Sequence, residues 1–458
     1  MYQKTYHIFF VGIGGIGMSG IAELLLRLNY RVSGSDLKST VITKRLKSLG
    51  GTIYKGHKAE HIAGADVLVT SSAIKKDNPE VLAARQASIP VIPRAEMLAE
   101  LMRLKYSVAI SGAHGKTTTT SMVAAVLEKG ALDPTVVIGG VLKSVGTNLM
   151  HGLGDFIVAE ADESDGSFLK FSPSIAVVTN IDEEHLDFYK DLEDIKNVFR
   201  QFIGRIPFYG LAILCLDSEP VQELIPEINC RYTTYGISTQ ADFQARNIVS
   251  QGPITIFDVY KHGEKMGRIS LNVPGMHNVL NGLAGIAVGM ELGIPFDTIK
   301  CALEKLEGVE RRLEIKGEEK GIMVIDDYGH HPTEIKATLK TVRECWPEKR
   351  IVVLFQPHRY SRTKALFNDF ARAFYQTDEL IVLPIYAASE EKIEDVTAER
   401  LCEETRAHGH KNVTYMENSE EVTRYLLSHL KKDDILLTLG AGNVYRLGET
   451  VVTLLSDK

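Results

Sequence analysis

The sequence is short of several features that would place it in a specialised class of protein. It has one tryptophan and five cysteines in 458 residues, and the cysteines lie far apart without a C-x-x-C pair. Scattered thiols are typical of a reducing compartment and argue against a disulfide framework or a zinc ribbon. No uninterrupted apolar run reaches the roughly 18 residues that a membrane span requires. We therefore expect a soluble, cytoplasmic protein.

Neither positively nor negatively charged residues are in large excess. Lys and Arg number 52 against 59 Asp and Glu, so the formal net charge is −7, and both signs are mixed along the chain. A large nucleic-acid-binding surface needs a basic excess, so we expect no nucleic acid among the partners. The composition, 44% hydrophobic and 24% charged, is that of an ordinary globular protein.

Short apolar runs alternate with helix-period stretches almost throughout the chain, which is typical of parallel sheets covered by helices. The length suggests about three domains at roughly 150 residues each. The alternation starts afresh twice, so we expect three α/β units at 1–105, 106–310 and 311–458. Within the second, residues 231–273 predict a small antiparallel excursion. Within the third, we expect a helix near 364–375.

The first unit opens on a glycine turn, G-x-G-x-x-G, between a predicted strand and a predicted helix. Gly14, Gly15 and Gly17 allow backbone N–H groups to approach a diphosphate at the helix N-terminus. Asp36 ends the next strand, where a ribose-binding acid would lie. The pattern alone favours a dinucleotide oxidoreductase, and the alternative is a tight turn without a ligand. We expect a bound diphosphate whose carrier the pattern leaves open.

A second glycine turn, GAHGKTT at 112–118, again joins a strand to a helix. In such a loop, backbone N–H groups cradle phosphates, a lysine reaches the β and γ oxygens, and a hydroxyl binds Mg²⁺. Lys116 and Thr117 supply the last two parts, although Ile110 stands where the full Walker spacing would place glycine. We expect this loop to bind a nucleoside triphosphate. The residues expected at the nucleotide here are Gly112, His114, Gly115, Lys116, Thr117 and Thr118.

Polar residues follow the next two strands of this unit. Glu160 comes first after an apolar run, and ligands of open α/β sheets lie beyond the strand ends, so we expect it to hold Mg²⁺ together with Thr117. Most of the acids that follow it, at 162–165, are interpreted as a solvated turn. His185 lies just past the next strand end, where it is a candidate metal or phosphate contact. The alternative for a lone histidine is a structural role.

Two polar clusters end adjacent strands of the third unit, DDYGHHP at 326–332 and QPHRYSR at 356–362. Arginine forks suit carboxylate or phosphate partners, so the two clusters together predict one wall of a site. Between the glycine turn and these clusters, His277 and Asn281 open a helix, where they either cap it or contact a ligand.

Taken together, the motifs identify a family. The chain resembles the Mur ligases of bacterial peptidoglycan synthesis over about residues 7–445, through GIGGIGMSG, GAHGKTTTT, EADESD, TNIDEEHLDFY, HNVLN, GVERRLE, DDYGHHPTE and QPHRYSRT. The last two motifs most resemble the alanine-adding branch. The resemblance implies a Rossmann-like N-terminal domain that binds a UDP-sugar, a central P-loop ATPase domain, and a Rossmann-like C-terminal domain with amino-acid and nucleotide contacts. The first glycine turn would then hold a UDP diphosphate.

The activity implied by the resemblance is ATP-dependent amide ligation. L-Alanine is joined to the lactyl carboxylate of UDP-N-acetylmuramate through an acyl phosphate, with ATP as co-substrate and Mg²⁺ as cofactor. We expect no membrane among the partners, and a monomer or weak homodimer. His358 is the candidate base for the amine proton.

The resemblance also implies a role for each candidate residue. The catalytic residues are Lys116, His185, His358 and Arg359. The nucleotide contacts beyond the second glycine turn are Asn281, Arg312 and Asp327. The substrate contacts are Gly14, Gly15, Gly17, Asp36, Ser71, Ser72, His330, Arg359 and Arg362. The metal ligands are Thr117, Glu160 and His185.

Two other classes of function compete with this interpretation. A nicotinamide oxidoreductase would use the first glycine turn and Asp36, but it leaves Lys116 and Thr117 unexplained. A nucleotide-switch protein would use the second turn alone and hydrolyse ATP slowly, indifferent to sugar nucleotides.

Overall fold

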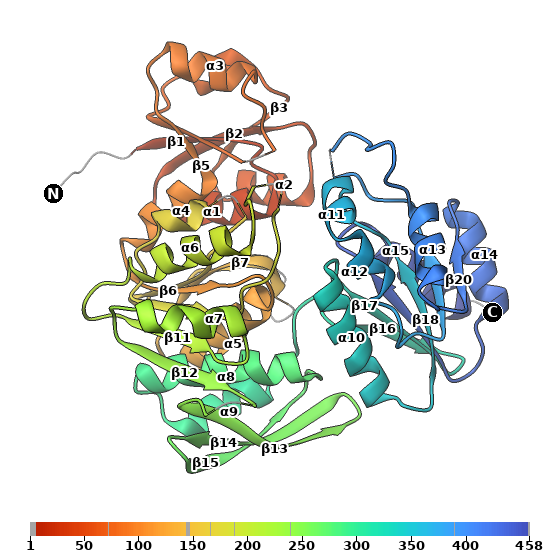
Figure 1. Cartoon of the computed structure of the whole chain (residues 1–458). Helices are drawn as coiled ribbons and strands as arrows, with labels where there is room; N and C mark the ends of the chain where they lie inside the picture. Colours follow the sequence, from red (N-terminus) through yellow and green to blue (C-terminus); the bar gives the residue numbers. More distant parts are fainter. Residues whose placement is uncertain are drawn as a thin grey trace. The chain divides into compact units, whose positions relative to one another are not determined.

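The structure is a computed structural model, and it describes residues 6–71, 73–142, 147–164, 166–186, 188–238, 240–388 and 390–456 (Figure 1). The chain forms two compact units. The first comprises Met1–Asp182, Lys196–Asp242 and Ala284–Ala302, and the second comprises Glu183–Ile195, Phe243–Leu283 and Leu303–Lys458. The boundary between them passes within helices α6 (Leu192–Ile203), α8 (Met276–Glu291) and α9 (Phe296–Glu304).

The N-terminal part of the first unit is a five-stranded parallel sheet in the order β3-β2-β1-β4-β5. Its strands are β1 His7–Val11, β2 Arg31–Asp36, β3 Thr52–Lys55, β4 Val67–Thr70 and β5 Val91–Pro93, and its helices are α1 Ile16–Arg27, α2 Val41–Ser48, α3 Pro79–Gln86 and α4 Arg94–Met102. Every residue of β1 is buried, which fits a central strand covered on both faces. Figure 1 shows α3 on one face and α1 on the other. Asn78 caps α3, and Pro79 occupies its first turn.

The central part of the first unit is a second sheet, in the order β12-β11-β10-β6-β9-β7-β8. Its strands are β6 Tyr106–Ser111, β7 Thr135–Leu142, β8 Thr147–Met150, β9 Phe156–Glu160, β10 Ile175–Val178, β11 Leu211–Cys215 and β12 Tyr232–Gly236. All pairs are parallel except β7 with β8. The helices along this stretch of chain are α5 Lys116–Lys129, α6 Leu192–Ile203, α7 Glu219–Leu224, α8 Met276–Glu291 and α9 Phe296–Glu304.

The second unit contains the expected antiparallel excursion. β13 Phe243–Gln251, β14 Ile254–Lys261 and β15 Glu264–Leu271 form two successive hairpins. The prediction for 231–273 is confirmed for these three strands. It does not hold for β12, which pairs in parallel with β11 in the first unit.

The C-terminal part of the second unit is a six-stranded sheet in the order β16-β17-β21-β18-β19-β20, parallel except for the edge strand β16. Its strands are β16 Glu314–Glu319, β17 Ile322–Asp327, β18 Arg350–Phe355, β19 Glu379–Val382, β20 Val413–Tyr415 and β21 Asp434–Leu439. Its helices are α10 Pro332–Cys345, α11 Tyr360–Ala365, α12 Phe367–Ala371, α13 Ala398–Ala407, α14 Ser419–His429 and α15 Tyr445–Ser456.

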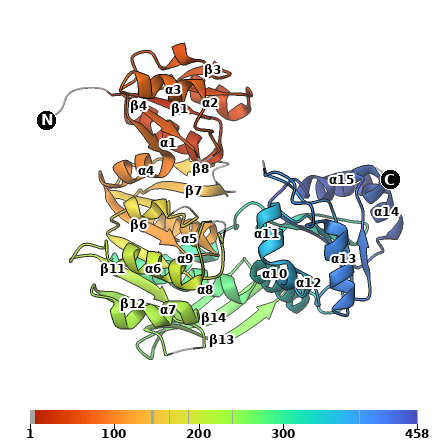
Figure 2. The same cartoon turned by 45° about the horizontal axis from the view of Figure 1, so that its top comes forward.

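Alternate residues of these strands feed two separate cores, one on each face of the C-terminal sheet. In β18, Ile351, Val353 and Phe355 pack with α10, α12 and α13 on one face of the sheet. Val352 and Leu354 pack with α14 and α15 on the other face. Figure 2 shows the strands with these helices around them. The sheet is therefore doubly wound, and its loops at the carboxyl ends of the strands carry the polar clusters of the sequence.

The single helix expected near 364–375 is wrong. The chain instead forms the two short helices α11 and α12, and Leu366 between them leaves the helical conformation with φ −109° and ψ 24°. Leu366 and Phe370 both lie in the core on one face of the C-terminal sheet.

Two expectations from composition can be compared with the structure. The five cysteines all fall within the described residues and are free thiols, as expected. Among the residues that the structure describes, no helix has both the length and the apolarity needed to cross a membrane.

Phe355 offers a test of how the C-terminal core supports the polar loop that follows β18. Its ring is fully buried and lies 5.0 Å from the ring centroid of Phe374. We expect Phe355→Ala to lower the free energy of unfolding by about 3–5 kcal/mol, because the truncation removes contacts and leaves a cavity. Urea unfolding of the full chain measures this, with the 93% exposed Phe208 changed to Ala as control. Equal losses in the two variants would contradict the prediction.

Candidate active site

The second glycine turn lies between β6 and α5 and is fixed by side chains at the end of β10. The Asn180 side chain accepts a hydrogen bond from the His114 N–H at 2.8 Å and donates one to the His114 carbonyl at 3.0 Å. Thr179 Oγ1 donates to the same carbonyl at 2.7 Å. A Cβ on Gly112, which has φ +134°, would lie 2.1 Å from that hydroxyl, so only glycine fits there.

Lys116 is the first residue of α5, and its ammonium group is fully engaged. Nζ donates to the carbonyl of Gly112 at 2.6 Å and forms an ion pair with Glu163 at 2.8 Å. Glu163 is only 3% exposed. The interpretation of the acids after Glu160 as a solvated turn is therefore wrong for Glu163, since a buried carboxylate next to a lysine needs that lysine as its partner.

Thr117 and Glu160 lie together, as the sequence predicts. The Thr117 hydroxyl and the Gly139 N–H both hydrogen-bond the Glu160 carboxylate, the latter at 2.9 Å. Burial raises the pKa of Glu160, while these two hydrogen bonds and the nearby Lys116 act in the opposite direction. Two hard oxygen donors beside a phosphate-binding loop fit a Mg²⁺ ion.

His114 and Thr118 complete this turn. His114 Nε2 lies 2.8 Å from the Asp182 carboxylate, so the ring is oriented by an acid at the end of β10. Thr118 is buried in the first turn of α5, directly after Gly115, which has the left-handed φ of +81°. Side chains after β10 thus hold the turn in place. The backbone N–H groups at the N-terminus of α5 can then face a phosphate.

The first glycine turn, between β1 and α1, is held by Asp36. Its Oδ2 accepts the Gly14 N–H at 2.9 Å, and its Oδ1 accepts the Lys38 N–H at 3.1 Å. A Cβ on Gly14 would lie 2.8 Å from the same carboxylate. Asp36 therefore shapes the turn, and its expected contact with a ribose stays a prediction. Ser72 lies outside the described residues.

Arg94 was not singled out in the sequence, yet it lies against this turn. Its side chain would be 3.1 Å from a Cβ built on Gly17, and its guanidinium lies 3.8 Å from Asp162 in the acidic run after β9. Ser71, at the end of β4, faces the same turn at Gly12. A guanidinium beside a glycine turn at a helix N-terminus suits a diphosphate.

In the second unit, Asp327 ends β17 and organises the chain around it. Its oxygens accept the N–H groups of Leu313 and Gly329, each at 2.8 Å, and the Thr338 hydroxyl at 3.2 Å. Burial raises the pKa of Asp327, opposed by the nearby Arg312. Three internal hydrogen bonds give this carboxylate a positioning role, so its expected contact with the nucleotide stays a prediction.

Arg312 and Asn281 are likewise held by neighbours. Arg312 lies 3.5 Å from Glu334 and 5.2 Å from the ring centre of Tyr328. Asn281 is buried and donates to the Asn278 side chain at 3.1 Å. Burial and then Arg312 lower the pKa of His277, the other residue that opens α8, to about 4.

The two polar clusters of the C-terminal sheet converge, as predicted, and Glu184 lies among them. Its carboxylate is 3.2 Å from the Arg362 guanidinium and 3.6 Å from His330 Nε2. Arg362 also lies 3.4 Å from His358 Nδ1. Glu184 is 7% exposed, so this group of side chains is a largely buried charge cluster.

His358 is held in its neutral form by this cluster. Its ring stacks on Tyr386 at 5.5 Å, and burial, with His330 and Arg362 nearby, lowers the pKa of His358 to about 3. A ring that is neutral at physiological pH can accept a hydrogen bond from Arg362. So low a pKa also makes it a weak base, which argues against His358 as the group that takes the amine proton.

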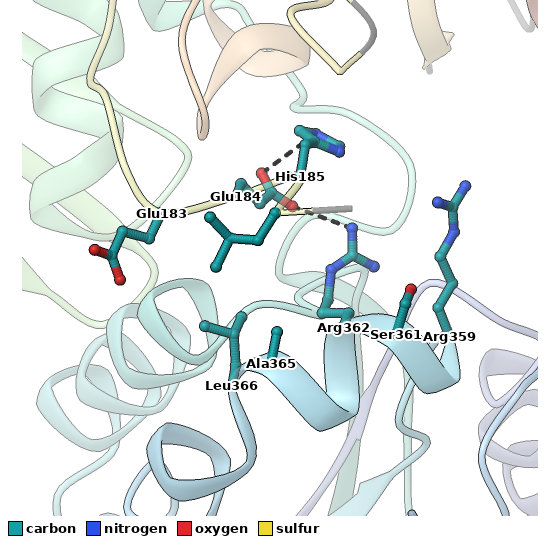
Figure 3. Close-up of a pocket in the computed structure, with 9 residues that line it drawn as sticks. Glu183, Glu184, His185, Arg359, Ser361, Arg362, Ala365 and Leu366 are labelled. Atoms are coloured by element: carbon teal, nitrogen blue, oxygen red, sulfur yellow. Dashed lines mark hydrogen bonds and ion pairs between the residues drawn. The ribbon is translucent and has the colours of Figure 1, made fainter. Parts of the chain in front are cut away.

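The cluster borders a small pocket of about 30 Å³ (Figure 3). Arg359, Arg362 and Glu184 line its polar side, while Ala365 and Leu366 line its apolar side. Figure 3 shows both arginine side chains rising from α11 toward the loop that carries Glu184 and His185.

Two residues at this pocket have a left-handed backbone. His185 has φ +57° and Arg359 has φ +70°. Neither is glycine, so each conformation costs free energy that its surroundings must offset. For Arg359, the N–H donates to the Tyr386 carbonyl at 2.8 Å. Such strain is common where a side chain must be aimed at a ligand.

Comparison with known proteins decides the family. Models of the Mur ligase family catalytic domain, the Mur ligase middle domain and the Mur ligase glutamate ligase domain match residues 7–106, 110–289 and 311–442. The UDP-N-acetylmuramate–L-alanine ligase of Desulfosudis oleivorans is 65% identical over 453 residues, 99% of each chain. That of Geotalea uraniireducens is 58% identical over 452 residues, 99% of this chain and 98% of the relative.

The chain belongs to the Mur ligase family.

Its fold is the three-domain α/β architecture of Mur ligases, as the sequence predicts. The crystal structure of the UDP-N-acetylmuramate–alanine ligase from Thermotoga maritima matches with a TM-score of 0.83 and 31% identity, covering 99% of this chain and 100% of that one. The murein peptide ligase from Psychrobacter arcticus matches with a TM-score of 0.72 at 22% identity, covering 99% of each chain. The second likeness concerns the fold alone.

Three residues of this Mur ligase were missed in the sequence although each contacts a candidate site residue. Glu163 pairs with Lys116, Glu184 pairs with Arg362, and Arg94 lies against the first glycine turn. Glu163 and Glu184 stand in runs of acids, where composition alone suggests solvent exposure. The burial of these two carboxylates is what marks them as site residues, and burial can be observed only in the folded chain.

Lys116 is the group on which we expect phosphate binding in this Mur ligase to depend most. Lys116→Ala should lower turnover by at least about 100-fold, because it removes the positive charge at the phosphate loop. Asn180 and Thr179 still hold the loop in this variant, but it loses the Lys116 bonds to the loop carbonyls and the ion pair with Glu163, so circular dichroism first checks that it is folded. Steady-state ATP hydrolysis measures the effect, with the exposed Lys129→Ala on the same helix as control. Near-normal turnover in folded Lys116→Ala would remove this lysine from the mechanism.

Proposed function

We propose that this chain joins L-alanine to UDP-N-acetylmuramate at the expense of ATP, in cytoplasmic peptidoglycan precursor synthesis. The observation that carries the proposal is its likeness to curated UDP-N-acetylmuramate–L-alanine ligases, for example 65% and 57% identity over 99% and 100% of this chain. The two sets of clustered side chains, one at the phosphate loop and one at the C-terminal sheet, support it with suitable chemistry. A monomer or weak homodimer stays our expectation for the oligomeric state.

The reaction needs an activated carboxylate, because hydroxide is a poor leaving group. Transfer of the γ-phosphoryl group of ATP to the lactyl carboxylate gives an acyl phosphate, and the alanine amine then attacks the carbonyl carbon and expels phosphate. Phosphoryl transfer depends mainly on positioning and electrostatic stabilisation. The turn at 112–118 supplies backbone N–H groups for the phosphates, and Lys116 supplies a positive charge.

Thr117 and Glu160 would hold a Mg²⁺ ion, whose chemistry is to neutralise phosphate charge. Their contact places a hydroxyl and a carboxyl oxygen together beside the phosphate loop, which fits a cation at this place. His185 belongs to the second unit, and its expected contact with a metal stays a proposal.

The C-terminal pocket is our proposed site for the amino acid. Arg359 and Arg362 suit its carboxylate, because guanidinium groups bind carboxylates through two parallel hydrogen bonds. The neutral His358 and the nearby His330 border the reacting groups. Ala365 and Leu366 on its apolar side suit a small apolar side chain.

ATP turnover measured with and without UDP-N-acetylmuramate and L-alanine tests the proposal directly. A ligase releases phosphate rapidly only when both are present. Slow turnover indifferent to both would favour a nucleotide-switch protein, and a change in reduced-cofactor absorbance would favour an oxidoreductase.

Isotope transfer tests the intermediate. With heavy oxygen in the lactyl carboxylate, one labelled atom per turnover should appear in inorganic phosphate, because the carboxylate oxygen that bridges carbon and phosphorus leaves with the phosphate. Phosphorus NMR resolves the labelled product. Pyrophosphate as the stoichiometric product, or label in AMP, would instead indicate an acyl adenylate and would contradict the role given to Lys116 and Thr117.

Arg94 provides a test of the sugar-nucleotide site. We expect Arg94→Ala to weaken UDP-N-acetylmuramate binding by about 10- to 100-fold, because a charge-assisted hydrogen bond to the diphosphate is lost. Calorimetric titration measures this, with the exposed Arg103→Ala at the end of the same helix as control. Unchanged affinity in Arg94→Ala would remove it from the site. Tight binding of NAD by the native chain, with none of UDP-N-acetylmuramate, would reverse the assignment of the glycine turn.

A further inference from the structure

Glu80 is a fully buried carboxylate in the N-terminal sheet domain, and the reaction itself gives it no task. It lies in the first turn of α3. Its Oε2 accepts the Ser35 hydroxyl at 2.6 Å and lies 3.0 Å from His57 Nδ1. Its Oε1 accepts the Lys58 N–H at 3.3 Å and lies 2.8 Å from His61 Nδ1. A carboxylate is unfavourable in the interior unless donors surround it, and here β2 and the chain after β3 supply four.

The arrangement of these side chains fits positioning and not nucleophilic catalysis. Ser35 is fully buried. Its Oγ and the Glu80 carboxylate both lie against the same nitrogen of His57, Nδ1, at 2.8 and 3.0 Å. A catalytic triad needs the hydroxyl and the carboxylate on opposite nitrogens of the ring, so that the imidazole can take the hydroxyl proton. The cluster therefore holds the ends of strands in place.

Ser35 connects this cluster to the first glycine turn. It is the last residue but one of β2, and its carbonyl accepts the Gly12 N–H at 2.8 Å and the Ile13 N–H at 3.0 Å. Asp36, the next residue, accepts the Gly14 N–H at 2.9 Å. Two successive residues of β2 thus hold three successive N–H groups of the turn. The position of the end of β2 therefore sets the shape of the turn.

We propose that Glu80 is a positioning residue for the sugar nucleotide, because it fixes the first glycine turn through Ser35. This inference rests on the proposed function, which assigns that turn to the diphosphate of UDP-N-acetylmuramate. A carboxylate can accept about four hydrogen bonds, and Glu80 has four donors around it. Glutamine keeps the shape of the side chain but offers one carbonyl oxygen, so it cannot accept from all four. The end of β2 then loses part of its anchor, and the N–H groups of the turn lose their alignment.

Calorimetric titration of the full chain with UDP-N-acetylmuramate tests this, on variants that circular dichroism shows to be folded. We expect Glu80→Gln to weaken binding by about 10-fold, because binding depends on groups that are aligned before the ligand arrives. Ser35→Ala should weaken it by a similar factor. The double variant should bind no more weakly than the weaker of the two single variants, because both changes break one connection. A loss in the double variant equal to the product of the single losses would overturn the proposal.

His61→Phe is the matched control for a merely structural role. His61 contacts Oε1, the oxygen of Glu80 other than the one that binds Ser35, and its ring stacks on Tyr54 at 4.2 Å. Phenylalanine keeps a ring for this stack but removes the donor. We expect a lower midpoint of urea unfolding and an unchanged affinity.

Three outcomes contradict the proposal, and one of them also concerns the proposed function. Equal weakening by His61→Phe and Glu80→Gln would indicate a general loosening of the domain and overturn the role of Glu80. Native affinity in folded Glu80→Gln would overturn this inference alone. Absence of UDP-N-acetylmuramate binding by the native chain would overturn the proposed function together with it.

Discussion

Each functional turn of this chain depends on a side chain at the end of a strand that hydrogen-bonds the backbone of the turn. Asn180 binds both backbone groups of His114 in the phosphate loop. Asp36 binds the Gly14 N–H in the first glycine turn, and Asp327 binds the turn that follows its own strand. Parallel strands end at one edge of a sheet, so a polar residue there can reach the loop next to it. The turns can then present N–H groups to phosphates without being shaped by the ligand, which is the preorganisation that phosphoryl transfer requires.

The cations that we assign to substrates are neutralised in the same way. Lys116 has Glu163 as its partner and Arg362 has Glu184, and both carboxylates are buried. A buried charge without a partner would destabilise the fold by several kcal/mol, so the pairing lets the chain keep strong charges in low-dielectric surroundings. It also means that a ligand anion must compete with a carboxylate for its cation.

The sequence was sufficient for the features that repeat or that have a strict spacing. Strand and helix alternation predicted the α/β class, and the glycine turns placed Lys116 and Thr117 at a strand-to-helix junction that the structure contains. Burial of individual acids could not be predicted, because Glu163 and Glu184 stand among exposed acids in the sequence and become buried only where a cation faces them. Nor could the break at Leu366 be predicted, since α11 and α12 together have a helical pattern and the turn depends on the core below.

The two glycine turns show why a pattern of residues identifies a backbone shape better than a ligand. Both lie between a strand and a helix, and in both a polar side chain accepts a hydrogen bond from a backbone N–H of the turn. They differ in the source of the cation. Lys116 belongs to the second glycine turn itself, whereas Arg94 belongs to α4 and its side chain lies against the first glycine turn. The carboxylate of Asp36 is engaged by the turn and by the Lys38 N–H, which leaves it less able to bind the two ribose hydroxyls of a nicotinamide cofactor. An anionic diphosphate held by N–H groups and a guanidinium satisfies this arrangement without any demand on Asp36, so the turn by itself fits the diphosphate of either kind of nucleotide.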